Sequence, residues 1–200
     1  DQIAIVDGFI REFAGADTTV VVDPVMGDYG RPYATYTPDM CAAMGGLAAL
    51  ADVITSNRTE AALLLGEDCE SISLKTEADC RRWAEALSLD GRRSVVLTGV
   101  SLEPGRVGAA CFDRDTGCTD FASAPLAPGQ FHGTGDLFSS VLAGALVRGR
   151  SLIEAAQMAA DFTSLCAART GKQDIPRREG IDFEPLLWRL GKEIMEEDDD

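Results

Sequence analysis

Basic side chains and histidine are scarce in this chain of 200 residues. It has 18 Lys and Arg against 33 Asp and Glu, a net charge of −15 and a single histidine, His132. Proteins that bind the phosphate backbone of nucleic acids, or anionic membranes, need a basic surface. The composition therefore argues against nucleic acid and membrane partners. With one histidine and no G-x-S-x-G elbow, it also disfavours a serine hydrolase triad.

Several sequence signatures are also missing. No apolar run is long enough to span a bilayer, and residue 1 is not followed by the layout of a signal peptide. The six cysteines form no C-x-x-C pair or zinc spacing, which predicts reduced thiols in a cytoplasmic protein. Neither a Walker P-loop nor the dinucleotide fingerprint G-x-G-x-x-G occurs.

The chain does contain alternating helix and strand patterns. Apolar spacing and caps predict helices at 2–14, 38–50, 57–65, 76–89, 134–147, 152–169 and 185–195, and β-rich runs predict strands at 18–22, 52–55, 94–97, 107–112 and 119–122. The run at 18–22 is typical of a strand buried on both faces. This alternation predicts an α/β fold with a mainly parallel sheet, in which ligands bind beyond the carboxyl ends of the strands.

The turn Gly133-Thr134-Gly135-Asp136 opens one of the predicted helices. Its glycines allow a sharp bend that directs backbone N–H groups and the helix dipole at an anion. A carboxylate at Asp136 could accept the proton of a substrate hydroxyl that attacks a phosphoryl group. The alternative interpretation is an ordinary glycine-rich helix start with a dipole-matched Asp.

Carboxylates follow two other strands. Asp23 and Asp28 lie in D-P-V-M-G-D after the first strand and would suit Mg²⁺, although Asp23 could instead cap loop N–H groups. Asn57 and Glu60 have ligand chemistry but also the spacing of a capping box. The segment from Tyr29 to Tyr36 could be a loop that closes over a nucleotide.

The order of these motifs resembles the pyridoxal kinases of the ribokinase-like superfamily. The resemblance rests on D-P-V-M-G-D, Y-T-P-D, A-D-V-I-T-S-N-x-x-E, V-V-L-T-G and G-T-G-D-L-F and runs from residue 1 to about 180. It implies a three-layer αβα sandwich around a mainly parallel sheet. It also implies that the protein is a phosphotransferase, which uses ATP to phosphorylate the 5′-hydroxymethyl group of pyridoxal, pyridoxine or pyridoxamine.

The resemblance assigns roles residue by residue. Asp136 would be the base, and Gly133, Thr134 and Gly135 would form the anion hole for the γ-phosphate. Asp23, Asp28 and Glu60 match positions associated with Mg²⁺ or a monovalent cation such as K⁺. The positions that would contact ATP are Tyr36 and five residues that stand at or just after the ends of predicted strands, namely Asp23, Thr55, Asn57, Thr98 and Gly99. Family members are often homodimers, so a homodimer is expected.

The sequence departs from the family pattern in two places. Thr55-Ser56-Asn57 stands where T-P-N is usual, and residue 1 already matches the helix before the D-P-V-M-G-D strand. The expectation is therefore one kinase domain over residues 1–192, incomplete at its N-terminus, followed by an acidic tail at 193–200.

Three alternatives remain open. Hydroxymethylpyrimidine kinases share D-P-V-M and the G-T-G turn, but commonly have Cys where Asp136 stands. A non-catalytic ATP-binding fragment is the second alternative. The third is an unrelated α/β binding domain in which the 57–60 and 133–136 motifs are only helix caps.

Overall fold

The protein folds around a five-stranded sheet. The structure is a computed structural model that describes residues 2–173 and 176–195, so most of the predicted acidic tail, 196–200, lies outside the described residues. Its elements are α1 (Gln2–Phe13), β1 (Val21–Val22), β2 (Gly27–Asp28), β3 (Arg31–Pro32), α2 (Pro38–Ala48), β4 (Val53–Ser56), α3 (Arg58–Leu65), α4 (Glu77–Leu87), β5 (Ser94–Val100), β6 (Arg106–Asp113), β7 (Cys118–Pro125), α5 (Thr134–Val147), α6 (Leu152–Thr170), η1 (Arg177–Glu179), η2 (Glu184–Leu186) and α7 (Leu187–Met195).

The strand order in the main sheet is β1-β4-β5-β6-β7. β1 pairs in parallel with β4, and β4 with β5, whereas β6 runs antiparallel to both β5 and β7. The parallel sheet is confirmed for the three strands whose ends carry the motifs. The β6–β7 pair is antiparallel because its short turn is too brief for a crossover connection.

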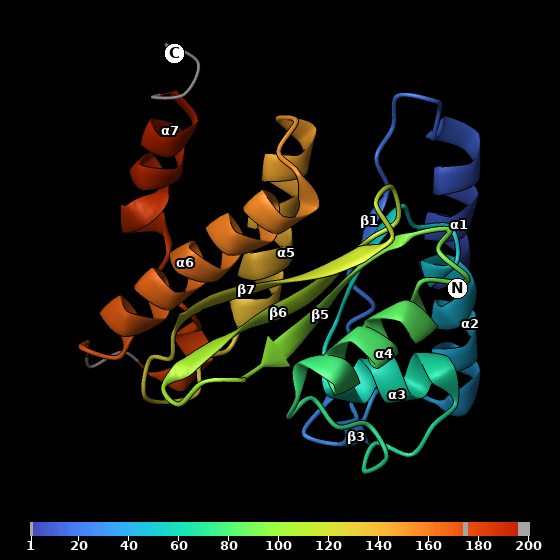
Figure 1. The fold of residues 1–200 in the computed structure, drawn as a ribbon, viewed down its shortest axis with the longest axis horizontal. Helices are drawn as coiled ribbons and strands as arrows, with labels where there is room; N and C mark the ends of the chain where they lie inside the picture. The colour runs from blue at the N-terminus through green and yellow to red at the C-terminus, as the bar shows by residue number, and fades with distance from the viewer. Residues whose placement is uncertain (1, 174–175, 196–200) are drawn as a thin grey trace.

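Helices cover both faces of this sheet and give the predicted three layers (Figure 1). Buried side chains of α5 and α6, such as Leu142 and Ala156, pack against one face in a cluster with Val96 and Ala109. On the opposite face, Ala62 of α3 and Ala84 of α4 pack against Val95. The two cores hold the strand ends at a fixed distance from the start of α5.

The first strand is shorter than predicted. Only Val21 and Val22 form β1, at the edge of the described sheet, and Val21 is half-buried rather than buried on both faces. The Val20 carbonyl accepts the N–H groups of Asp52 and Val53, but the Val20 N–H donates to the Asp52 carboxylate at 2.9 Å rather than to a backbone carbonyl. The strand therefore starts at Val21.

The segment expected to be a loop forms a small antiparallel hairpin. β2 pairs with β3, and the turn residues Tyr29 and Gly30 have φ of 52° and 79°. Positive φ at both central residues is the geometry of a type I′ turn, which matches the twist of paired strands. This β2–β3 hairpin lies beside α3 (Figure 1).

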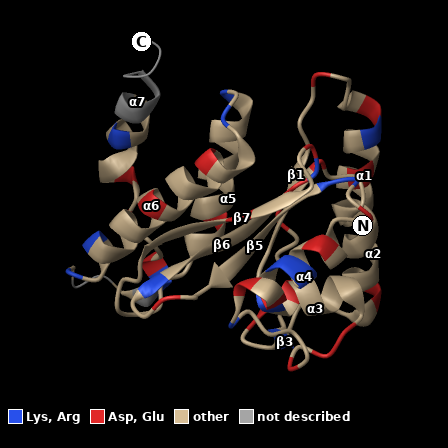
Figure 2. Ribbon diagram, viewed as in Figure 1, with Lys and Arg blue, Asp and Glu red and all other residues tan. Residues whose placement is uncertain are grey.

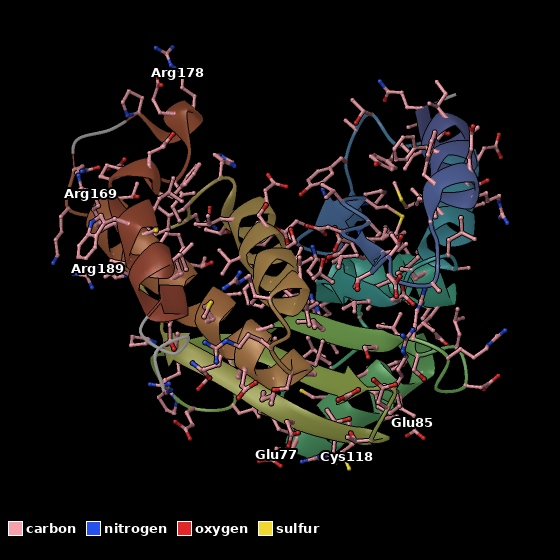
Figure 3. All side chains as sticks on the ribbon, turned by 90° about the horizontal axis from the view of Figure 1, so that it is seen from above. Glu77, Glu85, Cys118, Arg169, Arg178 and Arg189 are labelled. Atoms are coloured by element: carbon pink, nitrogen blue, oxygen red, sulfur yellow. The ribbon has the colours of Figure 1, made fainter. Side chains whose placement is uncertain are left out.

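The structure shows how the charged side chains and the cysteines are distributed. Figure 2 shows Lys and Arg interspersed with Asp and Glu, with no continuous basic face visible across the described residues in that view. In the part of the chain that the structure describes, no helix is both long and apolar enough to cross a membrane. All six cysteines are free; Cys118 is exposed at the edge of the molecule (Figure 3), whereas Cys80, Cys111 and Cys166 are buried.

Candidate active site at the carboxyl ends of the strands

A cavity of about 510 Å³, here called the strand-end cavity, opens beyond β1, β4 and β5 next to the start of α5. The sequence-predicted residues that line it are Asp23, Asp28, Thr55, Asn57, Glu60, Thr98, Gly99, Gly133, Thr134, Gly135 and Asp136. Tyr36 is not among the lining residues, because its ring packs against the cluster of Met26, Met44 and Leu47 beneath α2. The fold thus brings together all the predicted site residues except Tyr36.

Backbone N–H groups of α5 face one end of the strand-end cavity. Gly133 is the N-cap, with φ of 83°, a left-handed conformation that favours glycine, and it supplies no side-chain cap. The first N–H groups of a helix have no partner within the helix, so those that follow Gly133 are free to bind an anion. The Thr134 hydroxyl donates to the Phe131 carbonyl at 3.4 Å. This geometry agrees with the anion site predicted from the turn.

Ser139 connects α5 to the end of β1. Its hydroxyl lies 3.0 Å from Asp23 Oδ2 and also within reach of the Gly135 and Asp136 carbonyls of its own helix. Ser139 was not among the predicted site residues. Its position three residues after Asp136, on the same helical face, was the available signal.

Asp23 occupies a mostly buried position. Burial raises the pKa of the Asp23 carboxyl, the hydrogen bond from Ser139 lowers it, and the nearby Asp136 raises it again, with a net upward shift. The two carboxylates therefore repel each other across the cavity, and a bound cation would relieve that repulsion.

Asn57 and Glu60 form the capping box that was the alternative explanation for their spacing. The Asn57 side chain accepts the N–H groups of Thr59 and Glu60, and Glu60 Oε2 accepts the Asn57 N–H at 2.9 Å. The same two side chains also bind the segment after β1. Glu60 Oε1 accepts the Met26 N–H at 3.1 Å, and Asn57 Nδ2 donates to the Gly27 carbonyl at 2.9 Å.

Glu60 is a buried carboxyl, 4% exposed. Burial, together with the charges of Asp23 and Asp28, raises its pKa from 4.5 to about 7, although the two backbone N–H groups that it accepts lower it. Because the folded state holds this proton more tightly than the unfolded chain, Glu60 makes stability fall as the pH rises between about 4.5 and 7.

We expect the free energy of unfolding to reveal this titration in metal-free buffer. Between pH 5 and pH 8 the wild-type chain should lose about 2 kcal/mol more stability than Glu60→Gln, which cannot ionise. Urea unfolding curves at four pH values measure the difference. Parallel pH profiles for the two proteins would contradict a raised pKa for Glu60.

The strand-end cavity carries an excess of negative charge. Four carboxylates line it, and none of the described residues in its lining is Lys or Arg. The buried Thr55 hydroxyl lies beside Asp23 and lowers the pKa of that carboxyl. The negative charge of the lining fits a hard cation with anionic oxygen ligands.

The predicted metal ligands do not enclose an ion by themselves. Across residues 2–173 and 176–195, no three His, Cys, Asp or Glu side chains are grouped as a metal site. Glu60 explains part of this, because both of its oxygens bind backbone N–H groups. A cation held here would need phosphate or water oxygens to complete its coordination.

The opposite wall of the strand-end cavity was not predicted. It is formed by side chains from the β6–β7 pair and α6, among them Val107, Leu126, Thr163 and Ser164. These residues belong to no recognisable motif, so only the fold brings them together. Asp136 also borders a second, mainly apolar cavity of about 630 Å³ between α5 and the segment 179–190. His132 lines both cavities.

Comparisons with known proteins agree with this geometry. The family model described as phosphomethylpyrimidine kinase matches residues 2–176. The hydroxymethylpyrimidine/phosphomethylpyrimidine kinase of Rhizobium meliloti is 32% identical over 88% of this chain and 63% of its own length. The pyridoxine kinase of Bacillus subtilis is 33% identical over 72% of this chain and 51% of its own length.

A solved structure of a related protein has a similar fold. The pyridoxal kinase of Lactobacillus plantarum superposes with a TM-score of 0.82 and 30% identity, over 94% of this chain and 66% of that one. The chain thus spans between half and two thirds of the length of these relatives. With its family model matched along most of its length, the chain belongs to the phosphomethylpyrimidine and pyridoxal kinase family, and the ribokinase-like αβα fold predicted from its motifs is confirmed.

Proposed function

We propose that this protein transfers the γ-phosphate of ATP to the hydroxymethyl group of a B6 vitamer, namely pyridoxal, pyridoxine or pyridoxamine. The proposal rests on one observation. Asp136, the N–H groups after Gly133 and the Asp23 carboxylate all line the same cavity. A phosphoryl transfer enzyme needs a base, an anion hole and a site for a cation within a few ångströms of one another.

Each group has a separate task. The Asp136 carboxylate accepts the proton of the attacking hydroxyl, and it is exposed to the cavity rather than used as a helix cap. The N–H groups of α5 stabilise the negative charge that spreads over the transferred phosphoryl oxygens. Asn57, Thr55, Thr98 and Gly99 line the path of the nucleotide phosphates.

Asp23 and Asp28 would hold Mg²⁺ at the edge of the strand-end cavity, with a monovalent cation such as K⁺ as a further candidate. A bound divalent cation supplies charge neutralisation for the phosphates, which no Lys or Arg among the described lining residues provides. Ser139 orients Asp23 through its hydroxyl.

A B6 vitamer is favoured as the acceptor because residue 136 is Asp. A hydroxymethylpyrimidine is the second candidate acceptor, supported by the family model and by the relative from Rhizobium meliloti. Both acceptors are aromatic heterocycles with a primary hydroxyl, so the same base and anion hole would serve either one. We also propose that residues 1–192 form one kinase domain. As expected for the family, the protein would act as a homodimer.

A product screen tests the proposal and separates the candidates. The purified chain is incubated with Mg²⁺, K⁺, ATP and a mixture of the three vitamers and hydroxymethylpyrimidine, and products are identified by mass spectrometry. A phosphorylated vitamer is the expected product. A phosphorylated pyrimidine would favour the second candidate. Binding of MgATP without any phosphorylated acceptor would contradict both and indicate a non-catalytic nucleotide-binding module.

A further inference from the structure

The first turn of α3 holds the β2–β3 hairpin at three points. Glu60 Oε1 accepts the N–H of Met26, Asn57 Nδ2 donates to the carbonyl of Gly27, and the Thr59 hydroxyl accepts the N–H of Gly30 at 2.8 Å. Two of these side chains were singled out by the sequence, but Thr59 was not. The contacts extend from Met26, the residue just before β2, to the turn at Gly30.

Thr59 is placed to act on the turn itself. Its side chain is buried, with 2% of the residue exposed, and Gly30 is one of the two positive-φ residues of the turn. The N–H of the neighbouring Tyr29 donates to the carboxylate of the preceding residue, Asp28, at 2.7 Å. The Thr59 hydroxyl therefore reaches the turn from outside the hairpin and accepts the N–H of Gly30.

The hairpin has little freedom to adapt around this contact. A Cβ at Gly27 would overlap the Arg31 carbonyl oxygen and approach Pro32 Cα at 2.8 Å, so the two short strands are in close contact. Asp28, Tyr29 and Tyr33, at and beside the hairpin, line the strand-end cavity. If the hairpin moved away from α3, these three side chains would leave the cavity together.

We propose that Thr59 is a positioning residue, which seats the β2–β3 hairpin against α3 so that Asp28, Tyr29 and Tyr33 form one wall of the nucleotide site. The inference rests on the proposed function, because it concerns the same cavity. The Thr59 hydroxyl accepts a backbone N–H, and Thr59 is absent from the lining of the strand-end cavity, so it takes no part in phosphoryl transfer. When fewer molecules have a seated hairpin, the apparent affinity for nucleotide falls in proportion to the seated fraction.

The test compares Thr59→Val with wild type. Valine keeps the branched shape but cannot accept the Gly30 N–H, and a buried amide left without its acceptor disfavours the seated state. We expect the KM for MgATP to rise about tenfold and kcat to change less than twofold. In the nucleotide-free protein, hydrogen exchange of the Gly30 amide should accelerate about tenfold, while amides of β5 and β6 keep their rates.

Two further variants complete the design. Thr59→Ser retains the hydroxyl and should restore both the KM and the Gly30 exchange rate to within about twofold of wild type. Thr119→Val, a buried threonine in β7 outside the lining of the strand-end cavity, should leave both quantities unchanged. Thermal unfolding of all four proteins shows whether an effect follows the loss of stability alone.

The outcomes separate the inference from the proposed function. An unchanged Gly30 exchange rate in Thr59→Val, or faster exchange with an unchanged KM, overturns the positioning role while leaving the proposed function intact. A KM effect equally large in Thr119→Val also overturns it. A wild-type chain that does not bind MgATP overturns the proposed function and, with it, the nucleotide role of the hairpin.

Discussion

Replacing Asp136 with Asn should reduce kcat by about 10²- to 10⁴-fold, the usual contribution of a general base. Asparagine keeps the size of the side chain and its place in the first turn of α5, but it cannot accept the proton of the acceptor hydroxyl. The N–H groups after Gly133 are unaffected, so the Kd for MgATP should stay within about threefold of wild type. Steady-state kinetics and calorimetric titration measure the two quantities.

Asp79→Asn is the matched control for this change. Asp79 lies at the same position of the first turn of α4 and is absent from the lining of the strand-end cavity, so its replacement should leave turnover unaffected. If Asp136 were only a dipole-matched helix residue, its replacement would cost about 0.3–1 kcal/mol of stability and leave kcat unchanged. Retained turnover in Asp136→Asn would rule it out as the base.

We expect Gly108→Ala to lower the free energy of unfolding strongly, because there is no room for the added methyl group. A Cβ on Gly108 would overlap the carbonyl oxygen of Ala122 and come within 2.6 Å of Ser123 Cα, in the partner strand β7. β6 is hydrogen-bonded to β5 on one side and to β7 on the other, so the overlap can be relieved only by distorting the β6–β7 pairing. We expect a loss of about 3 kcal/mol or more and a Tm lower by about 6–12 °C.

Gly45→Ala is the control for this change, and we expect it to raise the Tm rather than lower it. Gly45 lies inside α2, and an added Cβ meets no atom within 4 Å. Alanine stabilises a helix interior by about 0.5–1 kcal/mol relative to glycine, so the Tm should rise slightly. Equal Tm values for Gly108→Ala and wild type would show that the β6–β7 pair can widen at no cost.

Local sequence signals located most of the secondary structure. Thr37, Asn57 and Thr76 cap α2, α3 and α4 as their residue types predicted, and Gly66 ends α3 with φ of 69°. These signals work because a helix cap depends on a few neighbouring residues. The β2–β3 hairpin escaped prediction because Tyr29, rather than Asn or Gly, takes the first positive φ of its turn.

Site residues were predictable where a strand end or a helix start carried a motif. Asp23, Thr55, Thr98 and the 133–136 turn were identified in this way, and parallel pairing places them at one edge of the sheet. Tyr36 was assigned to the site by resemblance alone. The structure instead packs it against Met26, Met44 and Leu47, since a turn closed by the Tyr36 N–H and the Tyr33 carbonyl leads the chain from the cavity to α2.

By itself, the sequence determined the fold class, the family motifs and the chemical types of the side chains at the strand ends. It could do so because periodicity, caps and glycine turns are local properties of the chain. Only the tertiary structure decided which distant groups meet: Ser139 with Asp23, Thr59 with Gly30, and the α6 wall with the start of α5. Such contacts depend on how two layers of helices pack on the sheet. The two hydrogen-bonded pairs join residues 29 and 116 positions apart in the chain, and such distant contacts leave no local sequence pattern.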